Sequence, residues 1–410
     1  MFKNDNLHIL KVENKVLVTN FENETMFSIP IEKYNKLDGE TLYNFSRKIS
    51  TNKNVLDKPF DININTLYII LTEKCNLGCT FCALGCDSSS EMDNLELDIN
   101  RIKNKLIDLI KQSNPRKIIL TGGEPLIYGK LGEVIELLKK HTTAKIVLQS
   151  NGLLLNEEII DRCLKDVDCI EISTSHYDEI GKLDNSLDYL IKSGCDLSLS
   201  FLFDGNYNKL YKVVDLVLDK KVGFVLNFIA GFGSAKLNDL NILSGEEKLK
   251  VYYNLARYLL NKENKDIEIL NYTFFSGLKI TKPCGAFGSI LTVYPNGNIY
   301  PCHSTTESCY CIGNIDEDNF DNVLKAYKKL MNSSKYKQKF VLNQNGICND
   351  CEYIYHCGGY CLAKDSKENL SDCILRKFWV DYYILYYDFK KAFRNNLTSF
   401  VNYYELKYKN

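Results

Sequence analysis

The sequence predicts an α/β protein built around a partial (β/α)6 TIM-like barrel, and two observations support this fold class. Between residues 66 and 240, short apolar runs alternate with longer segments of helical periodicity, which is typical of a parallel sheet covered by helices. Polar motifs also follow the ends of several runs, where such sheets bind ligands. The expected strands are LYIILT (67–72), KIILTG (117–122), KIVLQS (145–150), CIEIST (169–174), LSLSFLF (197–203) and FVLNFIA (224–230).

The regions on either side of this array have other patterns. Residues 7–30 contain short apolar runs separated by polar pairs, as in a small β-hairpin, and a helix is expected over 34–50. After residue 240, a helical segment leads into a cysteine-rich region and a tyrosine-rich helical tail. Because 410 residues exceed the size of one hydrophobic core, we expect several domains. Their expected bounds are 1–60, 61–275 and 276–410.

The composition narrows the possible partners and the compartment. A formal net charge of -1 gives no field to attract nucleic acid or an anionic membrane. The sequence has no apolar run long enough for a membrane span and no signal-peptide pattern at its start, so we expect a cytoplasmic protein. Cytosolic reductants keep thiols reduced, and the sixteen cysteines are therefore expected to be ligands rather than disulfides.

Three cysteines follow the first expected strand in CNLGCTFC, at Cys75, Cys79 and Cys82. Thiolates suit zinc, copper(I) or iron–sulfur clusters. A closed zinc site takes four ligands, whereas three cysteines on one loop leave one iron of a [4Fe–4S] cluster open to a substrate or cofactor. A zinc knuckle or buried thiols are the alternatives for these three residues alone. Cys86 falls outside the spacing, and we expect it to be a bystander or core thiol.

This C-x3-C-x2-C spacing, with Phe81 before the last cysteine and TGGEP after the second strand, resembles that of radical S-adenosylmethionine (SAM) enzymes. The resemblance implies that the three cysteines hold a [4Fe–4S] cluster whose fourth iron chelates SAM. It also implies reductive cleavage of SAM to a 5'-deoxyadenosyl radical, which abstracts hydrogen from a substrate. The electron would come from a reducing partner such as flavodoxin or ferredoxin.

Other residues at the strand ends are candidates for contacts with SAM. Gly122 and Gly123 allow the backbone to approach a ligand closely, and Glu124 could accept hydrogen bonds from an ammonium group. In the family, the GGEP segment contacts the methionine amine. The SNG turn matches a polar turn of the family, whereas the STSH serines lack the Asp-Gly and the arginine that commonly follow that strand. The cofactor-binding candidates are Phe81, Gly122, Gly123, Glu124, Ser150, Asn151, Ser173 and Ser175.

A second group of cysteines lies between residues 284 and 373. Its members are Cys284, Cys302, Cys348, Cys351, Cys357, Cys361 and Cys373. This order resembles the SPASM extension of radical SAM enzymes, which carries auxiliary iron–sulfur clusters, expected here to be of the [4Fe–4S] type. The resemblance assigns one cluster to Cys348, Cys351, Cys357 and Cys373, and the other to Cys284, Cys302 and Cys361. A zinc-ribbon-like domain is the alternative.

The Cys284 site has one ligand fewer than in sulfatase-maturing relatives, because Ile290 occupies the place of a further cysteine. Cys309 or Cys311 could complete the site, or an iron could stay open, and the sequence does not decide between these alternatives. The segment YPNGNIYPC predicts a β-hairpin with Asn296-Gly297 at its turn.

The residue after Cys302 bears on the reaction. Sulfatase-maturing relatives have an aspartate base there, but this chain has His303, for which we favour a hydrogen bond to a cluster sulfide over a role as base. The YPCH form is more like that of SPASM enzymes that modify peptides. The leading hypothesis is a radical SAM peptide maturase that acts on a ribosomal precursor peptide. A thioether crosslink is the most natural product if the Cys284 site has an open iron.

Other functions fit the same residues. They are a sulfatase-maturing-type protein-residue oxidase, a small-molecule radical SAM enzyme in cofactor biosynthesis, and a non-catalytic zinc or electron-transfer protein. Residues 1–60 could be a reduced module that grips a leader peptide by strand addition, or could only cap the barrel. The sequence singles out no residue as the catalytic hydrogen donor or base.

Overall fold

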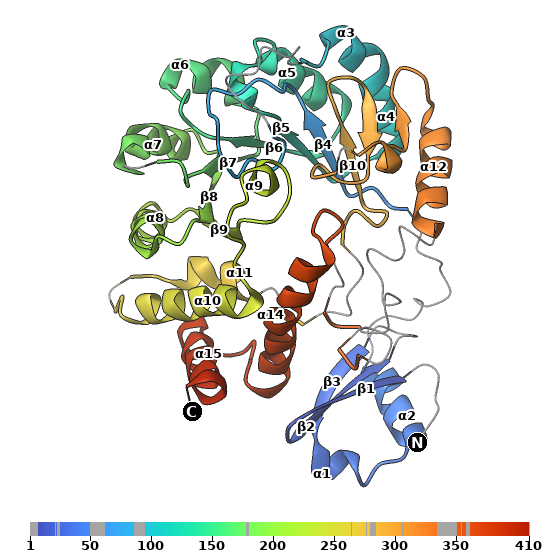
Figure 1. Cartoon of the computed structure of the whole chain (residues 1–410), viewed down its shortest axis with the longest axis vertical. Coiled ribbons are helices and arrows are strands. Elements are labelled where there is room, and N and C mark those ends of the chain that lie inside the picture. The colour runs from blue at the N-terminus through green and yellow to red at the C-terminus, as the bar shows by residue number, and fades with distance from the viewer. Residues whose placement is uncertain are drawn as a thin grey trace.

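The computed structural model describes most of the chain. The described residues are 7–20, 22, 25–49, 62–85, 95–177, 180–263, 265–275, 277–278, 284–305, 307–333, 351–353, 355–357 and 361–409. Cys86 and Cys348 lie outside them. In Figure 1 the barrel strands lie toward one end of the molecule, and the N-terminal sheet and C-terminal helices lie toward the other end.

Six parallel strands form the barrel. They are β4 (Thr66–Ile70), β5 (Lys117–Thr121), β6 (Lys145–Ser150), β7 (Cys169–Ser173), β8 (Asp196–Phe203) and β9 (Gly223–Phe228). Each strand pairs in parallel with the next along the chain. The order in the sheet therefore follows the order in the sequence, and the predicted fold class is confirmed.

The two faces of these strands differ in character. Leu120, Leu148 and Ile170 are partners in register, and all are fully buried. Side chains alternate along a strand, so the other face carries residues such as Gln149 and Glu171, whose side chains are hydrogen-bonded at 3.3 Å. The apolar runs expected from the sequence thus have one apolar face and one partly polar face inside the barrel.

Helices cover the outer face of the barrel (Figure 1). They are α3 (Ile99–Arg101), η1 (Ile102–Leu106), α4 (Ile107–Ser113), α5 (Leu131–His141), α6 (Glu157–Ile159), η3 (Ile160–Leu164), α7 (Asp184–Lys192) and α8 (Tyr207–Lys220). Their buried residues recur every three or four positions, as Val213, Val214 and Val217 do on α8. This apolar stripe fixes each helix against the sheet and leaves the strand ends free for the site.

The barrel sheet continues into the second cysteine region. Strand β10 (Ile290–Val293) pairs in parallel with β4, and β11 (Asn298–Tyr300) and β12 (Gly313–Asn314) extend the sheet antiparallel. The predicted hairpin is confirmed, with Gly297 at a positive φ of 88°. Because β10 bonds directly to β4, the region around Cys302 is held against the edge of the barrel.

The N-terminal region differs from the expected hairpin and single helix. Strands β1 (Leu7–Val12), β2 (Lys15–Asn20) and β3 (Thr25–Pro30) form an antiparallel three-stranded sheet. Two helices follow, α1 (Ile31–Tyr34) and α2 (Gly39–Ile49), so the helix expected over 34–50 is wrong between them. The break has a local cause, since the Asp38 carboxylate accepts the backbone N–H of Thr41 at 2.6 Å and starts a new helix.

Six helices of the described residues follow the barrel strands: α9 (Ser234–Leu237), α10 (Gly245–Leu260), α11 (Asn271–Phe274), α12 (Phe320–Asn332), α14 (Ser366–Leu385) and α15 (Phe393–Tyr408). In Figure 1, α9 and α12 lie at the barrel, whereas α10, α14 and α15 lie toward the other end of the molecule. Stacked rings such as Trp379 and Phe400, with centroids 4.9 Å apart, join α14 to α15. Among the described helices, none combines the length and apolar character needed to cross a membrane.

The N-terminal sheet packs against α14. Leu10, Val12 and Leu17 form a buried group with Val380 and Ile384. The Lys15 ammonium donates hydrogen bonds to the carbonyls of Ile384 and Leu385, at 3.1 and 2.9 Å. A cation there is favourable because the last carbonyls of a helix carry partial negative charge.

Candidate metal centres and active site

The predicted motifs meet at the carboxyl ends of the barrel strands. The loop of residues 73–85, here called the cysteine loop, follows β4 and lies beside the GGE turn that follows β5. Gly123 donates its N–H to the carbonyl of Thr72, and Glu124 donates to that of Lys74, both at 2.8 Å. A Cβ on Gly123 would lie 2.1 Å from the Lys74 oxygen. We expected the glycines to allow a ligand to approach; the close approach in the structure is that of the cysteine loop.

Glu124 links two strand ends beneath this loop. It is fully buried, and its carboxylate accepts hydrogen bonds from the Ser150 hydroxyl at 2.7 Å and the Asn151 N–H at 2.8 Å. It also accepts from the N–H of Leu126 at 3.0 Å. Burial raises the pKa of the Glu124 carboxyl. Both oxygens thus accept hydrogen bonds from the protein, and the contact with an ammonium group expected from the sequence stays a prediction.

Asn151 extends this network to the cysteine loop itself. Its side-chain amide donates to the Asn76 side-chain oxygen at 2.7 Å, one residue after Cys75. Its own carbonyl accepts the Tyr177 hydroxyl at 3.0 Å. The predicted pair Ser150 and Asn151 therefore lies directly under the loop, where both residues fix its position.

The structure brings the three loop thiols together. Cys75, Cys79 and Cys82 are each partly buried and interact electrostatically with one another. Burial, with the neighbouring thiols, raises the pKa of Cys79 to about 11. The half-buried Phe81 belongs to the same loop. Three separate thiolates at this site would be poorly solvated and would repel one another. A cationic iron–sulfur group that binds all three would compensate their charge, so the site fits such a group.

The remaining serine candidates, Ser173 and Ser175, lie at the end of β7 and just after it, and their surroundings differ. Ser175 is buried, and its hydroxyl accepts the N–H of Leu202 at 2.6 Å, so it links β7 to β8. Ser173 is the last residue of β7 and remains partly exposed on the polar face. Of the two, only Ser173 has a side chain open to the barrel interior.

Sequence reasoning missed one element of this site, residues 229–238 after β9, here called the strap. Ser234 donates its N–H to the Cys82 carbonyl at 2.8 Å, and the Asn238 side chain donates to the Thr80 carbonyl at 3.0 Å. Gly233 has a φ of 58°, and a Cβ there would lie 2.3 Å from the Cys82 oxygen. The Gly-x-Gly-Ser pattern after the last strand was the signal that could have revealed this turn.

A second group of thiols lies where β10 joins the barrel. Cys284, Cys302 and Cys361 interact electrostatically with one another, and burial raises the pKa of Cys302 to about 11. The side chain of Ile290 packs against Gly285 beside them. Cys309 and Cys311 are exposed and hydrogen-bonded to Glu307 and to the Gly313 carbonyl.

Unpartnered polar atoms surround this second group. Within the described residues, Arg376 Nη1, Thr292 Oγ1 and His303 Nδ1 are buried without a hydrogen-bond partner. The His303 ring stacks on Tyr68 of β4 with centroids 4.4 Å apart, and burial lowers its pKa to about 4. Such atoms beside thiols fit a bound group that accepts or donates hydrogen bonds, as the sulfides of a cluster do.

The residues predicted for the other auxiliary cluster are partly described. Cys373 lies on α14 and Cys357 follows His356, whose ring is hydrogen-bonded to Thr19 of the N-terminal sheet at 3.1 Å. Cys351 precedes Glu352, whose carbonyl accepts a hydrogen bond from His8 at 2.8 Å. Cys348 lies outside the described residues, so the predicted four-cysteine set stays a prediction.

A single-ion site is not evident in the part of the chain that the structure describes. No three His, Cys, Asp or Glu side chains there converge on a point suited to one metal ion.

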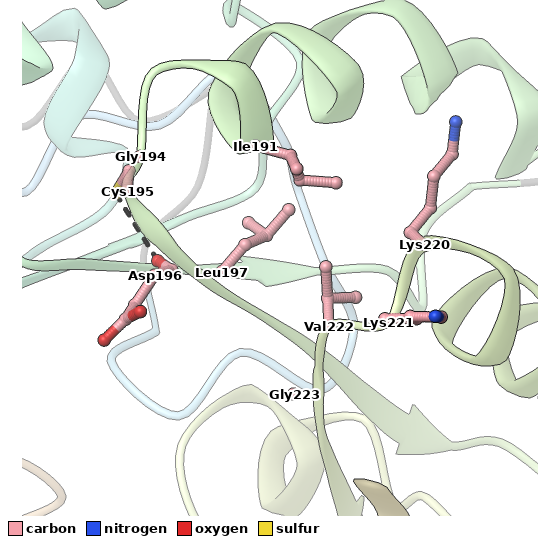
Figure 2. Close-up of a pocket in the computed structure, with 9 residues that line it drawn as sticks. All are labelled: Ile191, Gly194, Cys195, Asp196, Leu197, Lys220, Lys221, Val222 and Gly223. Carbon is pink, nitrogen blue, oxygen red and sulfur yellow. Dashed lines mark hydrogen bonds between the residues drawn. The ribbon is translucent and has the colours of Figure 1, made fainter. Parts of the chain in front are cut away.

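A surface cavity of about 460 Å³ lies at the opposite end of the barrel. It is lined by the starts of β8 and β9, including Asp196 and Gly223 (Figure 2). Lys220 in its wall is paired with Asp188 at 2.7 Å, and Figure 2 shows the Lys220 and Lys221 side chains pointing away from Cys195. This cavity is remote from the carboxyl ends of the strands and carries none of the predicted site residues.

Two family models match this chain. Residues 69–232 match the Radical SAM superfamily, and residues 284–352 match SPASM, the iron-sulfur cluster-binding domain. The first match contains the cysteine loop, the GGE turn and part of the strap. The second contains Cys284 and Cys302.

Two sequence relatives and one solved structure illustrate which known proteins this chain is similar to. A probable GTP 3',8-cyclase of Methanococcus vannielii is 24% identical over 312 residues, which cover 70% of this chain and 98% of the cyclase. The radical SAM cyclopropyl synthase TigE of Paramaledivibacter caminithermalis is 24% identical over 344 residues, covering 74% of this chain and 69% of TigE. Streptococcus suis SuiB, solved with its precursor peptide SuiA, has a TM-score of 0.58 at 12% identity, covering 91% of this chain and 99% of SuiB. The likeness to SuiB concerns the fold.

Proposed function

Because the chain is a radical SAM superfamily enzyme with a SPASM domain, we propose that it is a peptide maturase. It would cleave SAM reductively and modify one residue of a ribosomal precursor peptide in the cytoplasm, with flavodoxin or ferredoxin as electron donor and with neither nucleic acid nor membrane as a partner. We also propose the division into residues 1–60, 61–275 and 276–410. The non-catalytic alternative is set aside by the family.

The observation that carries the proposal is that the N-terminal sheet packs against α14, the same helix whose Asn369 bonds to the backbone of Cys361 in the second thiol group. Strand β3 pairs with β2 on one side, and no described strand pairs with its other side. An extended peptide could add to that edge, which supports leader binding over a simple capping role. The match to the probable cyclase leaves a part of this chain uncovered, whereas the fold likeness to SuiB covers 91% of it.

The chain's own residues have distinct tasks in this proposal. Cys75, Cys79 and Cys82 would hold the cluster that, with SAM bound, supplies the 5'-deoxyadenosyl radical. Glu124 and Asn151 keep the loop in place through the buried hydrogen bonds described above. The proposed contacts with SAM stay those expected from the sequence. Phe81, Gly122, Gly123 and Ser173 are partly exposed, whereas Glu124, Ser150, Asn151 and Ser175 are buried.

We propose a thioether as the product, with the Cys284 site as the place where a substrate thiol binds. Two features support an open ligand position there. Ile290 is an apolar packing residue at the place of the missing cysteine, and the Cys309 and Cys311 thiols are exposed with hydrogen-bond partners of their own. A small-molecule reaction is the second candidate function, because probable GTP 3',8-cyclases are among the relatives of this chain.

Anaerobic reconstitution tests the proposal. We expect about twelve irons per chain for three [4Fe–4S] clusters, and 5'-deoxyadenosine formed from SAM only when dithionite is added. Cys79→Ala should abolish SAM cleavage, and Cys348→Ala should abolish peptide modification. A short cysteine-containing reading frame beside the gene would supply the peptide. Turnover of GTP, with no change in that peptide's mass, would favour the small-molecule alternative.

A further inference from the structure

The strap that clamps the cysteine loop is itself held by helix α14. The Glu368 carboxylate accepts the backbone N–H of Gly231 at 2.9 Å. A Cβ on Gly231 would lie 3.2 Å from that oxygen, so the two groups are in close contact. The Glu368 side chain is 7% exposed, and a charge-assisted bond shielded from water is stronger than an exposed one.

Glu368 belongs to a buried charge group of four side chains. Lys364 lies 2.8 Å from Glu368 and 2.7 Å from Asp372, and Lys248 of α10 lies 2.7 Å from Asp372 and 3.9 Å from Glu368. Two cations and two carboxylates balance each other in this group. Removing one partner of a buried ion pair leaves an uncompensated charge and is strongly destabilising, so the two lysines favour a single position of the Glu368 carboxylate.

The same helix contacts the second thiol group. Asn369, the next residue, bonds to both the N–H and the carbonyl of Cys361, at 2.8 and 3.1 Å. One end of α14 therefore contacts Cys361 through Asn369 and reaches Cys82 through Glu368, Gly231 and Ser234. These contacts cross from the SPASM region to the barrel.

We propose that Glu368 is a positioning residue for the cysteine loop, acting through the strap. Glu368 fixes Gly231, and the strap then places the Ser234 N–H on the Cys82 carbonyl. Docking of α14 therefore adds a hold on the Cys82 end of the cysteine loop, beside the hold that the GGE turn and Asn151 exert on its Cys75 end. Folding of the auxiliary region is thereby linked to SAM cleavage. This inference rests on the proposed role of Cys82 as a cluster ligand.

Hydrogen exchange of the full chain tests whether Glu368 acts on the cysteine loop through the strap. Three variants are compared, two at Glu368 and one at Asp372. Glu368→Met keeps the side-chain length and removes the acceptor, whereas Glu368→Gln keeps an acceptor oxygen without the charge. Asp372→Asn disturbs the same two lysines but makes no contact with the strap. We expect Glu368→Met to speed exchange in residues 229–238 and 75–85 about tenfold, and Glu368→Gln to restore most of the protection. Asp372→Asn leaves the Glu368 acceptor in place, so it should speed exchange mainly in α10 and α14 and much less in the strap than Glu368→Met does.

Gly231→Ala tests the link from the strap side and leaves the charge group intact. It should speed exchange in the same two segments by a smaller factor. With reconstituted protein, Glu368→Met should also weaken the change that SAM produces in the electron paramagnetic resonance spectrum of the reduced cluster, and Asp372→Asn should weaken it less.

Several outcomes would overturn the inference. Unchanged exchange in residues 75–85 for both Glu368→Met and Gly231→Ala would do so, as would an equal increase in Asp372→Asn. If the wild-type protein took up no iron, the proposed function would fail, whereas the exchange data would still decide whether Glu368 positions the loop.

Discussion

The Asn369 side chain forms hydrogen bonds with both backbone groups of Cys361: its oxygen accepts the Cys361 N–H at 2.8 Å and its amide donates to the Cys361 carbonyl at 3.1 Å. Asn369 is only 3% exposed, and its amide also donates to the Lys364 carbonyl at 3.2 Å. A single side chain thus fixes the backbone of a proposed cluster ligand near the start of α14.

Asn369→Leu should therefore impair the cluster proposed at Cys284, Cys302 and Cys361. The leucine has a similar volume but cannot bond to the Cys361 backbone, so we expect about four fewer irons per chain and Mössbauer signals of the other clusters retained. Asn396→Leu is the matched control, because Asn396 is equally buried and bonds to the Asp388 carbonyl in the connection between α14 and α15, where none of the proposed cluster ligands lies. Equal iron loss in both variants would argue for general destabilisation.

Gly233→Ala should disrupt the cysteine loop, because a Cβ there would lie 2.3 Å from the Cys82 oxygen. We expect SAM binding to weaken at least about tenfold, since the loop backbone must move. Gly205→Ala provides the control: Gly205 also has a positive φ, 96°, but a Cβ there meets nothing within 4 Å. It should cost about 1 kcal/mol of stability and leave SAM affinity unchanged. Titration calorimetry with SAM on both variants distinguishes collision from backbone strain.

The barrel could be predicted from the sequence because its signals are local. Each apolar run such as KIVLQS lies between turn residues, and the structure has a strand there, β6 (Lys145–Ser150). The hairpin turn at Asn296-Gly297 is equally local, since its positive φ requires such residues. Strand existence and order followed from these short patterns.

What could not be predicted depends on partners far apart in the chain. The pairing of β10 with β4 joins residues more than 200 positions apart and leaves no mark in either strand. The hydrogen bonds that Glu124 accepts from Ser150 and Asn151 were not predicted either, because nothing near Glu124 in the sequence indicates these partners. The strap was missed for the same reason, since its contacts lie at Cys82 and Glu368.

Lys15→Met should loosen the N-terminal sheet from α14. The Lys15 ammonium satisfies two carbonyls at the end of that helix, and its loss should cost about 1 kcal/mol. Lys11→Met removes an equal charge from the exposed side chain of the same sheet, which contacts only the Tyr34 ring among the interactions described, and should cost less. Thermal unfolding and limited proteolysis after residue 30 would compare the variants. Equal effects would contradict a specific docking role for Lys15.

His176 should make the stability of the fold depend on pH. Burial lowers its pKa to about 4, against an ordinary value of 6.5, and its Nε2 is buried without a partner among the described residues. Between these two pH values the unfolded chain binds a proton that the folded chain excludes. The neutral ring therefore makes its full contribution to the free energy of unfolding above about pH 6.5. This contribution is lost as the pH falls toward 4, with a slope of at most about 1.4 kcal/mol per pH unit.

His176→Phe should flatten this slope in chemical denaturation of the iron-free chain between pH 7 and pH 5. Tyr177→Phe is the matched control, because it removes the hydrogen bond to the Asn151 carbonyl but no group that titrates in this range. It should lower stability by about 1 kcal/mol at every pH. An unchanged slope in His176→Phe would contradict this account, because it would mean that the ring binds its proton at the same pH in the folded protein as in the unfolded chain.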